Sequence, residues 1–116
     1  MADYEPDCVF CRIAAGEIPS DIVHSDDTVV VFRDLNPRAP THVLAIPRRH
    51  IPSVAEVTDS DGDLLGSLFG ALRRVAQDAG VTSYRIVTNV GPDSGQSVFH
   101  LHFHLLAGRQ MSWPPG

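Results

Sequence analysis

The feature that most constrains the fold is a row of histidines that alternate with bulky apolar residues, His100-Leu101-His102-Phe103-His104-Leu105-Leu106. A β-strand places successive side chains on opposite faces, with a rise of about 3.3 Å per residue. In a strand the three histidines therefore share one face, and the apolar residues, with Phe99, share the other. In a helix, residues two apart point about 200° away from each other, so no common histidine face forms. The sequence therefore predicts a strand over residues 97–106.

The length of this strand limits what the histidines can do together. The rings of His100 and His104 would stand roughly 13 Å apart along the backbone. Metal–nitrogen bonds are about 2 Å long, so the three imidazoles cannot easily bind one small ion. We therefore expect the row to divide between separate tasks.

The composition restricts the class of protein. A chain of 116 residues is long enough for one domain with a core, but not for two. The net charge of −5 argues against broad binding to nucleic acid or anionic membranes, because both require a basic surface. No apolar run is long enough to span a bilayer, and the acidic start lacks the features of a signal peptide. The expectation is a cytoplasmic protein that binds neither nucleic acid nor membrane.

Local signals predict an α+β fold on a five-stranded antiparallel sheet. We expect a flexible tail over residues 1–7, then a single domain over 8–116 with an irregular, proline-containing segment at 108–116. A short helix is predicted over 8–16, and one long helix over 59–79, which starts with acidic residues and stops at Gly80. Besides the histidine strand, strands are predicted at 22–24, 29–34, 41–46 and 84–90.

The two cysteines, Cys8 and Cys11, form a C-x-x-C pair. In a cytosolic chain this spacing fits half of a zinc site or a redox pair better than a structural disulfide. The chain lacks the βαβ context of thioredoxin-like redox catalysts, which favours the zinc site.

Two further features have both a functional and an ordinary interpretation. Gly95 permits close approach of a ligand to the backbone, and the amides around Gln96 and Ser97 can bind phosphate oxygens, although such a loop is also a plain turn. Asp34 ends a predicted strand and precedes Asn36-Pro37, where a turn aspartate is common.

These residues resemble the histidine-triad (HIT) superfamily. The run His100–Leu106 matches its signature, and the ending Trp113-Pro114-Pro115-Gly116 is similar to the C-terminus of its Hint branch, the purine nucleoside phosphoramidases. Other landmarks of the family occur in the same order, namely Asp34-Leu35-Asn36-Pro37, Thr41–Pro47, Asn89 and Gly95-Gln96-Ser97. The resemblance covers residues 8–116, with no departure at a catalytic position.

The resemblance implies a hydrolase that cleaves purine nucleoside 5′-phosphoramidates, such as adenosine 5′-phosphoramidate, through a covalent nucleotidyl-histidine. His102 is the implied nucleophile, assisted at the phosphate and leaving group by His104, His42 and Ser97. A neutral imidazole is available near pH 7, because an unperturbed histidine has a pKa of about 6.5. The ordinary alternative is that His102 is a satisfied strand residue and His42 a core histidine.

The resemblance also implies a nucleotide site in which Asp34 accepts hydrogen bonds from the ribose hydroxyls. An apolar pocket would hold the base, although core packing explains the same residues without a ligand. The implied pocket residues are Val9, Phe10, Ile13, Phe32, Leu35 and Leu44. The other implied nucleotide-binding residues are Asn89, Gly95, Gln96, Ser97, His102, His104 and Trp113.

The same resemblance implies a bound metal ion and a second copy of the chain. A structural Zn²⁺ would be held by Cys8, Cys11, His50 and His100, a closed tetrahedral set with no open position, and no organic cofactor is expected. A homodimer is implied, in which segment 108–116 reaches towards the partner's active site and Trp113 shapes leaving-group preference. The alternative is a tryptophan packed on its own domain.

Three other functions remain open from the sequence. A dinucleoside polyphosphate hydrolase of the same superfamily would also cleave at an α-phosphorus, although the Trp113–Gly116 ending favours the phosphoramidase. A nucleotide-binding regulatory module would have only incidental turnover. A zinc-stabilised interaction domain would not depend on nucleotide at all.

Overall fold

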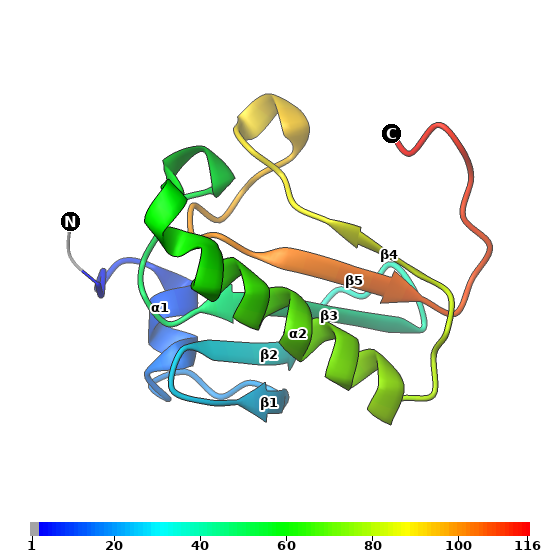
Figure 1. Cartoon of the computed structure of the whole chain (residues 1–116), viewed down its shortest axis with the longest axis horizontal. Helices are drawn as coiled ribbons and strands as arrows, with labels where there is room; N and C mark the ends of the chain where they lie inside the picture. The colour runs from blue at the N-terminus through cyan, green and yellow to red at the C-terminus, as the bar shows by residue number, and fades with distance from the viewer. Residues whose placement is uncertain (1–2) are drawn as a thin grey trace.

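Five antiparallel strands form one sheet in the order β1-β2-β3-β5-β4. The computed structural model describes residues 3–116. Helix α2 (Gly62–Asp78) crosses one face of the sheet, and the short helix α1 (Val9–Ala14) lies on the other side (Figure 1). Within residues 3–116, no helix combines the length and apolar character needed to cross a membrane. The strands are β1 (Ile22–Ser25), β2 (Val29–Arg33), β3 (Thr41–Pro47), β4 (Tyr84–Val87) and β5 (Phe103–Ala107).

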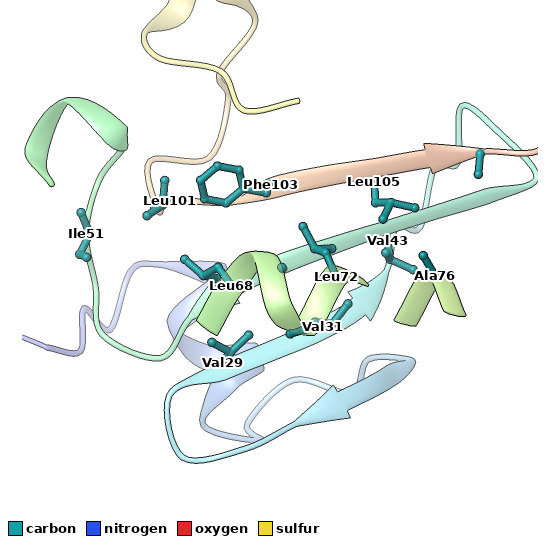
Figure 2. Close-up of a cluster of buried hydrophobic side chains, with 13 residues drawn as sticks. Val29, Val31, Val43, Ile51, Leu68, Leu72, Ala76, Leu101, Phe103 and Leu105 are labelled. Atoms are coloured by element: carbon teal, nitrogen blue, oxygen red, sulfur yellow. The ribbon is translucent and has the colours of Figure 1, made fainter. Parts of the chain in front are cut away.

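The strands β2 and β3 are buried on both faces, which explains why they read as continuous apolar runs. Their odd-numbered side chains, such as Val31 and Val43, pack with Leu68 and Leu72 of α2 (Figure 2). Their even-numbered side chains pack against α1 in a second cluster, made up of Phe10, Ile13, Val30, Phe32, Leu44 and Ile46. The α+β class, the five-stranded antiparallel sheet and the two predicted helices are confirmed.

The predicted histidine strand is too long at its start. β5 begins only at Phe103, because the preceding residues bond to the end of β3 and the loop after it instead of extending the ladder. The Leu101 amide donates to the Ile51 carbonyl (2.6 Å), and His100 Nε2 donates to the Pro47 carbonyl (2.8 Å). Phe99 is 49% exposed and does not join the apolar face, contrary to the prediction.

Two other boundaries also differ from the prediction. The long helix begins at Gly62, because residues 59–61 form a separate 3-10 turn. The buried Asp61 holds this turn by accepting from the Thr58 amide (2.9 Å) and from Arg49 (2.7 Å). β4 ends at Val87, three residues before the predicted end.

Residues 3–7 run from the N-terminal side into α1 and contact the neighbouring loop. The His50 amide donates to the Asp3 carbonyl (2.9 Å), and the Glu5 amide donates to Cys11 Sγ (3.4 Å). The tail expected over residues 1–7 has its first two residues outside the described part of the chain. These contacts place residues 3–7 beside the C-x-x-C pair.

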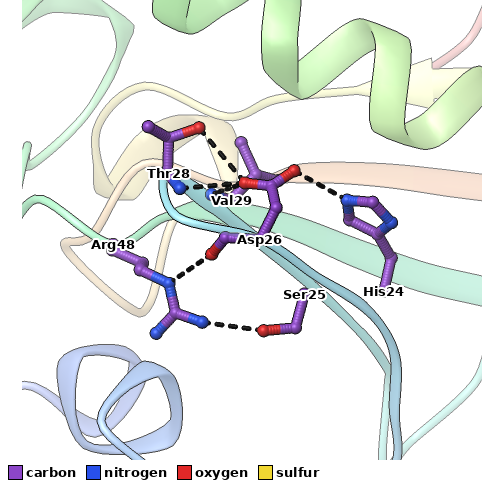
Figure 3. A network of polar contacts seen from close by, with 6 residues as sticks. All are labelled: His24, Ser25, Asp26, Thr28, Val29 and Arg48. Atoms are coloured by element: carbon purple, nitrogen blue, oxygen red, sulfur yellow. Dashed lines mark hydrogen bonds and ion pairs between the residues drawn. The ribbon is translucent and has the colours of Figure 1, made fainter.

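The turn between β1 and β2 is closed by Asp26, whose Oδ1 accepts from the Thr28 and Val29 amides (Figure 3). Arg48, directly after β3, donates to the Asp26 carbonyl and the Ser25 hydroxyl. The same guanidinium donates to the Ala14 carbonyl (2.7 Å) at the C-terminal end of α1. Arg48 therefore fixes this end of α1 to the sheet.

Replacing Gly108 with alanine is expected to destabilise the fold by about 1–3 kcal/mol. Gly108 has a φ of +97°, and an added Cβ would lie 2.9 Å from Pro40 Cβ, so both the backbone and the contact become strained. Denaturant unfolding measures the effect. Gly66→Ala is the matched control, because open space surrounds this α2 position and alanine favours a helix. An unchanged unfolding midpoint for Gly108→Ala would contradict the account.

Candidate active site and metal site

The phenyl ring of Phe10 separates the histidine row into two sites. Phe10 makes edge-on contacts with His100 and with His102, at ring-centroid distances of 6.1 and 5.1 Å. On one side, His100 approaches the cysteine pair. On the other, His102 and His104, with rings 5.0 Å apart, line a cavity. The row thus divides between two environments, as its length predicts.

The His102 ring is held in one tautomer. Its Nδ1 lies 2.7 Å from the His100 carbonyl, which can only accept a hydrogen bond, so Nδ1 carries the proton. The neutral ring therefore has its lone pair on Nε2. Burial lowers the pKa of His102, opposed by the hydrogen bond to the His100 carbonyl and by the charge of Asp34. The neutral, nucleophilic form is thus the favoured form near pH 7.

A second chain of hydrogen bonds fixes His42 and His104. The Arg38 amide donates to His42 Nδ1 (3.0 Å), so the proton of neutral His42 is on Nε2. His42 Nε2 lies 2.9 Å from His104 Nδ1 and donates to it. Neutral His104 therefore carries its own proton on Nε2, where it is a hydrogen-bond donor. Burial lowers the pKa of both rings, that of His104 to about 4.

The carboxylate of Asp34 serves both a turn and the histidine pair. Its Oδ1 accepts from the Asn36 amide (2.8 Å), which is the turn role considered from the sequence. Its Oδ2 lies 3.4 Å from His42 Nε2, and the residue also lines the cavity. The turn interpretation and a binding role are therefore compatible.

The cavity has a volume of about 370 Å³ and a mostly apolar wall. All six residues predicted for the base pocket line it, together with Asp34, Ser97, His102 and His104. Sequence reasoning missed five further lining residues, which lie mainly in irregular segments without periodicity: Ile18, Pro19, Ser20, Asn36 and Val98. The sequence thus identified one wall of the cavity and overlooked the other.

Four predicted nucleotide-binding residues do not line this cavity: Asn89, Gly95, Gln96 and Trp113. The Gln96 side chain is buried and holds the loop, accepting from the Gly91 amide and donating to the Pro52 and Val98 carbonyls. Gly95 has a φ of +97°, which favours glycine. Trp113 is 81% exposed, so the alternative of a tryptophan packed on its own domain is wrong for this chain.

Cys8, Cys11, His50 and His100 bring their ligand atoms within 4.8 Å of one another. The Nδ1 atom of His100 lies 3.3 Å from Cys8 Sγ and 3.5 Å from Cys11 Sγ, and His50 Nδ1 lies 3.3 Å from Cys11 Sγ. Tetrahedral zinc with ordinary bond lengths requires N···S separations of about 3.6 Å. Because His100 Nε2 donates to the Pro47 carbonyl, its Nδ1 keeps a free lone pair for a metal. The four residues fit a tetrahedral zinc site.

A second cluster, Asp34, His42 and His104, has similar spacing but does not offer a comparable set of ligands. His42 Nε2 carries a proton and donates it to His104 Nδ1, so the two facing nitrogens already share one hydrogen. This cluster is therefore better suited to acid–base and hydrogen-bonding work than to a metal.

Comparisons with known proteins agree with this arrangement. Residues 7–113 match the family described as "Scavenger mRNA decapping enzyme C-term binding". An uncharacterized HIT-like protein of Synechocystis is 47% identical over 111 residues, covering 95% of this chain and 97% of that protein. The 14 kDa zinc-binding protein of Zea mays is 45% identical over 111 residues, covering 93% of this chain and 87% of that protein.

The similarity extends to three dimensions. A crystal structure of a HIT family hydrolase from Legionella pneumophila superposes with a TM-score of 0.93 at 47% identity, covering 95% of this chain and all of that one. The chain therefore belongs to the matched family and, with it, to the histidine-triad (HIT) superfamily. The resemblance inferred from the histidine row is confirmed.

Proposed function

We propose that the protein is a nucleotide hydrolase that cleaves purine nucleoside 5′-phosphoramidates through a covalent intermediate on His102. The observation that carries this proposal is the His102 ring, whose proton is held on Nδ1 by the His100 carbonyl while Nε2 is free beside the cavity. The likeness to a HIT family hydrolase and the Trp113–Gly116 ending support it.

In the first step, His102 Nε2 attacks the α-phosphorus in line with the leaving amine. A phosphorus–nitrogen bond to His102 forms, the bond to the amine breaks, and the amine leaves with a proton taken from solvent. Water then attacks the nucleotidyl-histidine, gives a proton back to solvent, and releases the nucleotide and the neutral imidazole. Two easier displacements replace one difficult one.

The remaining groups act on the phosphate and the leaving group. His104 Nε2–H is a donor for a phosphate oxygen, because His42 occupies its Nδ1. The Ser97 hydroxyl, at the cavity, donates near the leaving group, and the Ser97 amide donates to a phosphate oxygen, whereas the Gln96 amide already donates to the Gly91 carbonyl (3.1 Å). Asn89 and Gly95 are the other residues of this region that we propose contribute to nucleotide binding.

The cavity binds the nucleoside. Its apolar wall, with Phe10 and Phe32, holds the base, and Asp34 accepts from the ribose hydroxyls. A cavity of about 370 Å³ is of the size that small-molecule sites occupy. In the proposed homodimer, the exposed Trp113 reaches the partner's site and shapes the choice of amine.

The metal of the Cys8, Cys11, His50 and His100 site is proposed to be structural zinc. The fit of the four ligand atoms carries this assignment, and the zinc-binding relative from maize supports it. Bound zinc stabilises the fold by joining α1 to the segments after β3 and before β5. It takes no part in the displacement, because the ligand set is closed.

The test compares hydrolysis of adenosine 5′-phosphoramidate and a diadenosine polyphosphate by the same preparation. A strong preference for the phosphoramidate supports the proposal. Preference for the polyphosphate assigns the protein to the other hydrolase activity of the superfamily. Binding of nucleotide without turnover of either compound would refute the enzyme and favour the regulatory module.

Replacing Asp34 with asparagine is expected to raise KM for the phosphoramidate about tenfold or more while changing kcat less. Asparagine keeps an acceptor for the Asn36 turn but removes the charge that strengthens hydrogen bonds to the ribose. Steady-state kinetics measure the effect. A 2′,3′-dideoxy substrate should be bound equally well by both proteins, and a full KM difference on that substrate would contradict the ribose assignment.

The pH profile of kcat/KM should lose activity only well below the ordinary histidine pKa of 6.5. Burial, reinforced by the neighbouring His102 and His42, lowers the pKa of His104 to about 4. Between pH 6.5 and 4 the unfolded chain binds a proton at His104 that the native protein does not bind, and the lowered pKa of His42 acts in the same direction, so stability also falls as the pH falls through this range. A fall of kcat/KM to half of its plateau at or above pH 6.5 would contradict the account.

A further inference from the structure

The cysteine pair is open to solvent on one side. Cys11 is only 2% exposed, whereas Cys8 is partly exposed. Cys8 and His50 line a surface hollow of about 490 Å³, bordered also by Ser97 and Phe99. A small polar reagent can therefore reach the Cys8 side chain through this hollow, which adjoins the nucleotide cavity and shares Val9, Ser97 and Val98 with it.

The two sulfurs are also placed to react with each other. Their Sγ atoms are among the four ligand atoms that lie within 4.8 Å of one another. Cys8 is the N-cap of α1, and its Sγ accepts from the Cys11 amide (3.4 Å), so the side chain already points towards residue 11. Joining them requires side-chain rotation and a small shift at the start of α1.

The same pair is connected to the nucleotide site by two short routes. Through α1, Cys8 and Cys11 fix Phe10, which forms part of the cavity wall and contacts the His102 ring. Through the metal site they fix His100, whose carbonyl orients His102. The far end of α1 is held independently by Arg48, so a disturbance at the cysteines affects mainly the Phe10 end.

We propose that Cys8 and Cys11 form an oxidation site that controls the nucleotide site. One thiolate attacks a hydroperoxide and the second thiolate then displaces the oxygen from the first sulfur: the peroxide O–O bond breaks, a sulfur–sulfur bond forms, and two protons from solvent are taken up to give an alcohol and water, or two waters from hydrogen peroxide. The cysteines are oxidised by two electrons and the peroxide is reduced. The disulfide has no thiolate to bind a metal, so the site releases zinc. Phe10 and His100 each lose one of their anchors, although His100 keeps its hydrogen bond to the Pro47 carbonyl, and nucleotide binding weakens; this last step rests on the proposed function.

This site differs from the thioredoxin-like redox catalyst that the sequence disfavours. It turns over no substrate, and a thiol reductant with zinc restores the starting state. The α2-side core, which includes Leu68, Leu72 and Leu105, contains no residue of α1. The domain is therefore expected to stay folded while the Cys8–Phe10 region loosens.

The experiment titrates the zinc-loaded full chain with hydrogen peroxide. Released zinc is followed with a chromogenic chelator, the disulfide by intact mass, and AMP affinity by calorimetry. We expect one zinc released for each disulfide formed. We also expect a loss of AMP affinity of about tenfold or more, which is the size of effect seen when residues that orient the groups of a site, without contacting the ligand, are removed. Reductant plus zinc should restore the affinity. Circular dichroism checks that the oxidised chain remains folded.

Cys8→Ser is the matched variant, because serine is a good N-cap and cannot form the disulfide. Its AMP affinity should be low before treatment and unchanged by peroxide. A peroxide effect that is seen in the wild-type chain alone is then due to the cysteine pair and not to oxidation of other residues. Peroxide that releases no zinc would overturn the oxidation site. Zinc release with unchanged AMP affinity would overturn the control of the nucleotide site.

The outcome also separates this proposal from the proposed function. If the reduced, zinc-loaded protein does not bind AMP, the nucleotide hydrolase is refuted. The coupling is then measured from the NMR signals of the His102 imidazole, whose Nδ1–H should lose its hydrogen bond on oxidation. Unchanged His102 signals in the oxidised protein would overturn the coupling in either case.

Discussion

His102→Ala should reduce hydrolysis of adenosine 5′-phosphoramidate by about 10³-fold or more. The substitution removes the ring whose free Nε2 lies beside the cavity and whose tautomer is fixed by the His100 carbonyl. In enzymes that use a covalent intermediate, loss of the nucleophile removes the pathway, and the remaining groups give only a small residual rate. Single-turnover assays at saturating substrate measure this loss directly.

The matched control is His24→Ala. His24 lies on β1, where its Nε2 is 2.8 Å from Asp26, outside both sites. Its removal should leave the rate of hydrolysis unchanged. Near wild-type turnover by His102→Ala, or an equal loss in both variants, would contradict the assignment of the nucleophile.

Removing zinc should lower the free energy of unfolding by several kcal/mol. The four ligands come from three segments far apart in the sequence, so the unfolded chain has no preformed site and binding stabilises only the native state. At a free zinc concentration 1,000 times the dissociation constant, this linkage contributes about 4 kcal/mol. Denaturant unfolding with zinc and with a strong chelator measures the difference.

Cys11→Ala tests the same effect within the chain. Burial raises the pKa of the Cys11 thiol to about 11, so the thiolate form depends on the bound cation. The variant should unfold at the same denaturant concentration with and without zinc. A wild-type midpoint that is insensitive to the chelator would contradict a structural metal.

Much of the fold was predictable because the periodicity of the apolar residues matches the elements. The row from Phe103 to Leu105 alternates as the strand does, and the β-branched run at Val29–Val31 is buried on both faces. The start of β5 was not predictable in this way. His100 and Leu101 follow the same alternation, but their partners are the Pro47 and Ile51 carbonyls, and sequence periodicity carries no information about such long-range bonds.

The site shows the same limit. The apolar wall from α1, β2 and β3 was identified from the family resemblance, whereas Ile18, Pro19 and Ser20 lie in an irregular connection without a motif. The division of the histidine row was predictable from its length. That Phe10 separates the two halves, and that backbone carbonyls fix the tautomers of His100 and His102, follows only from the packing of α1 on the sheet.

The most direct test of the central claim is to trap the covalent intermediate. The enzyme is mixed with excess adenosine 5′-phosphoramidate, denatured rapidly in alkali and digested, and the peptide that carries the histidine row is sequenced by mass spectrometry. The account predicts an AMP adduct on His102, absent from His102→Ala. Rapid hydrolysis with no adduct, or an adduct on another residue, would contradict it.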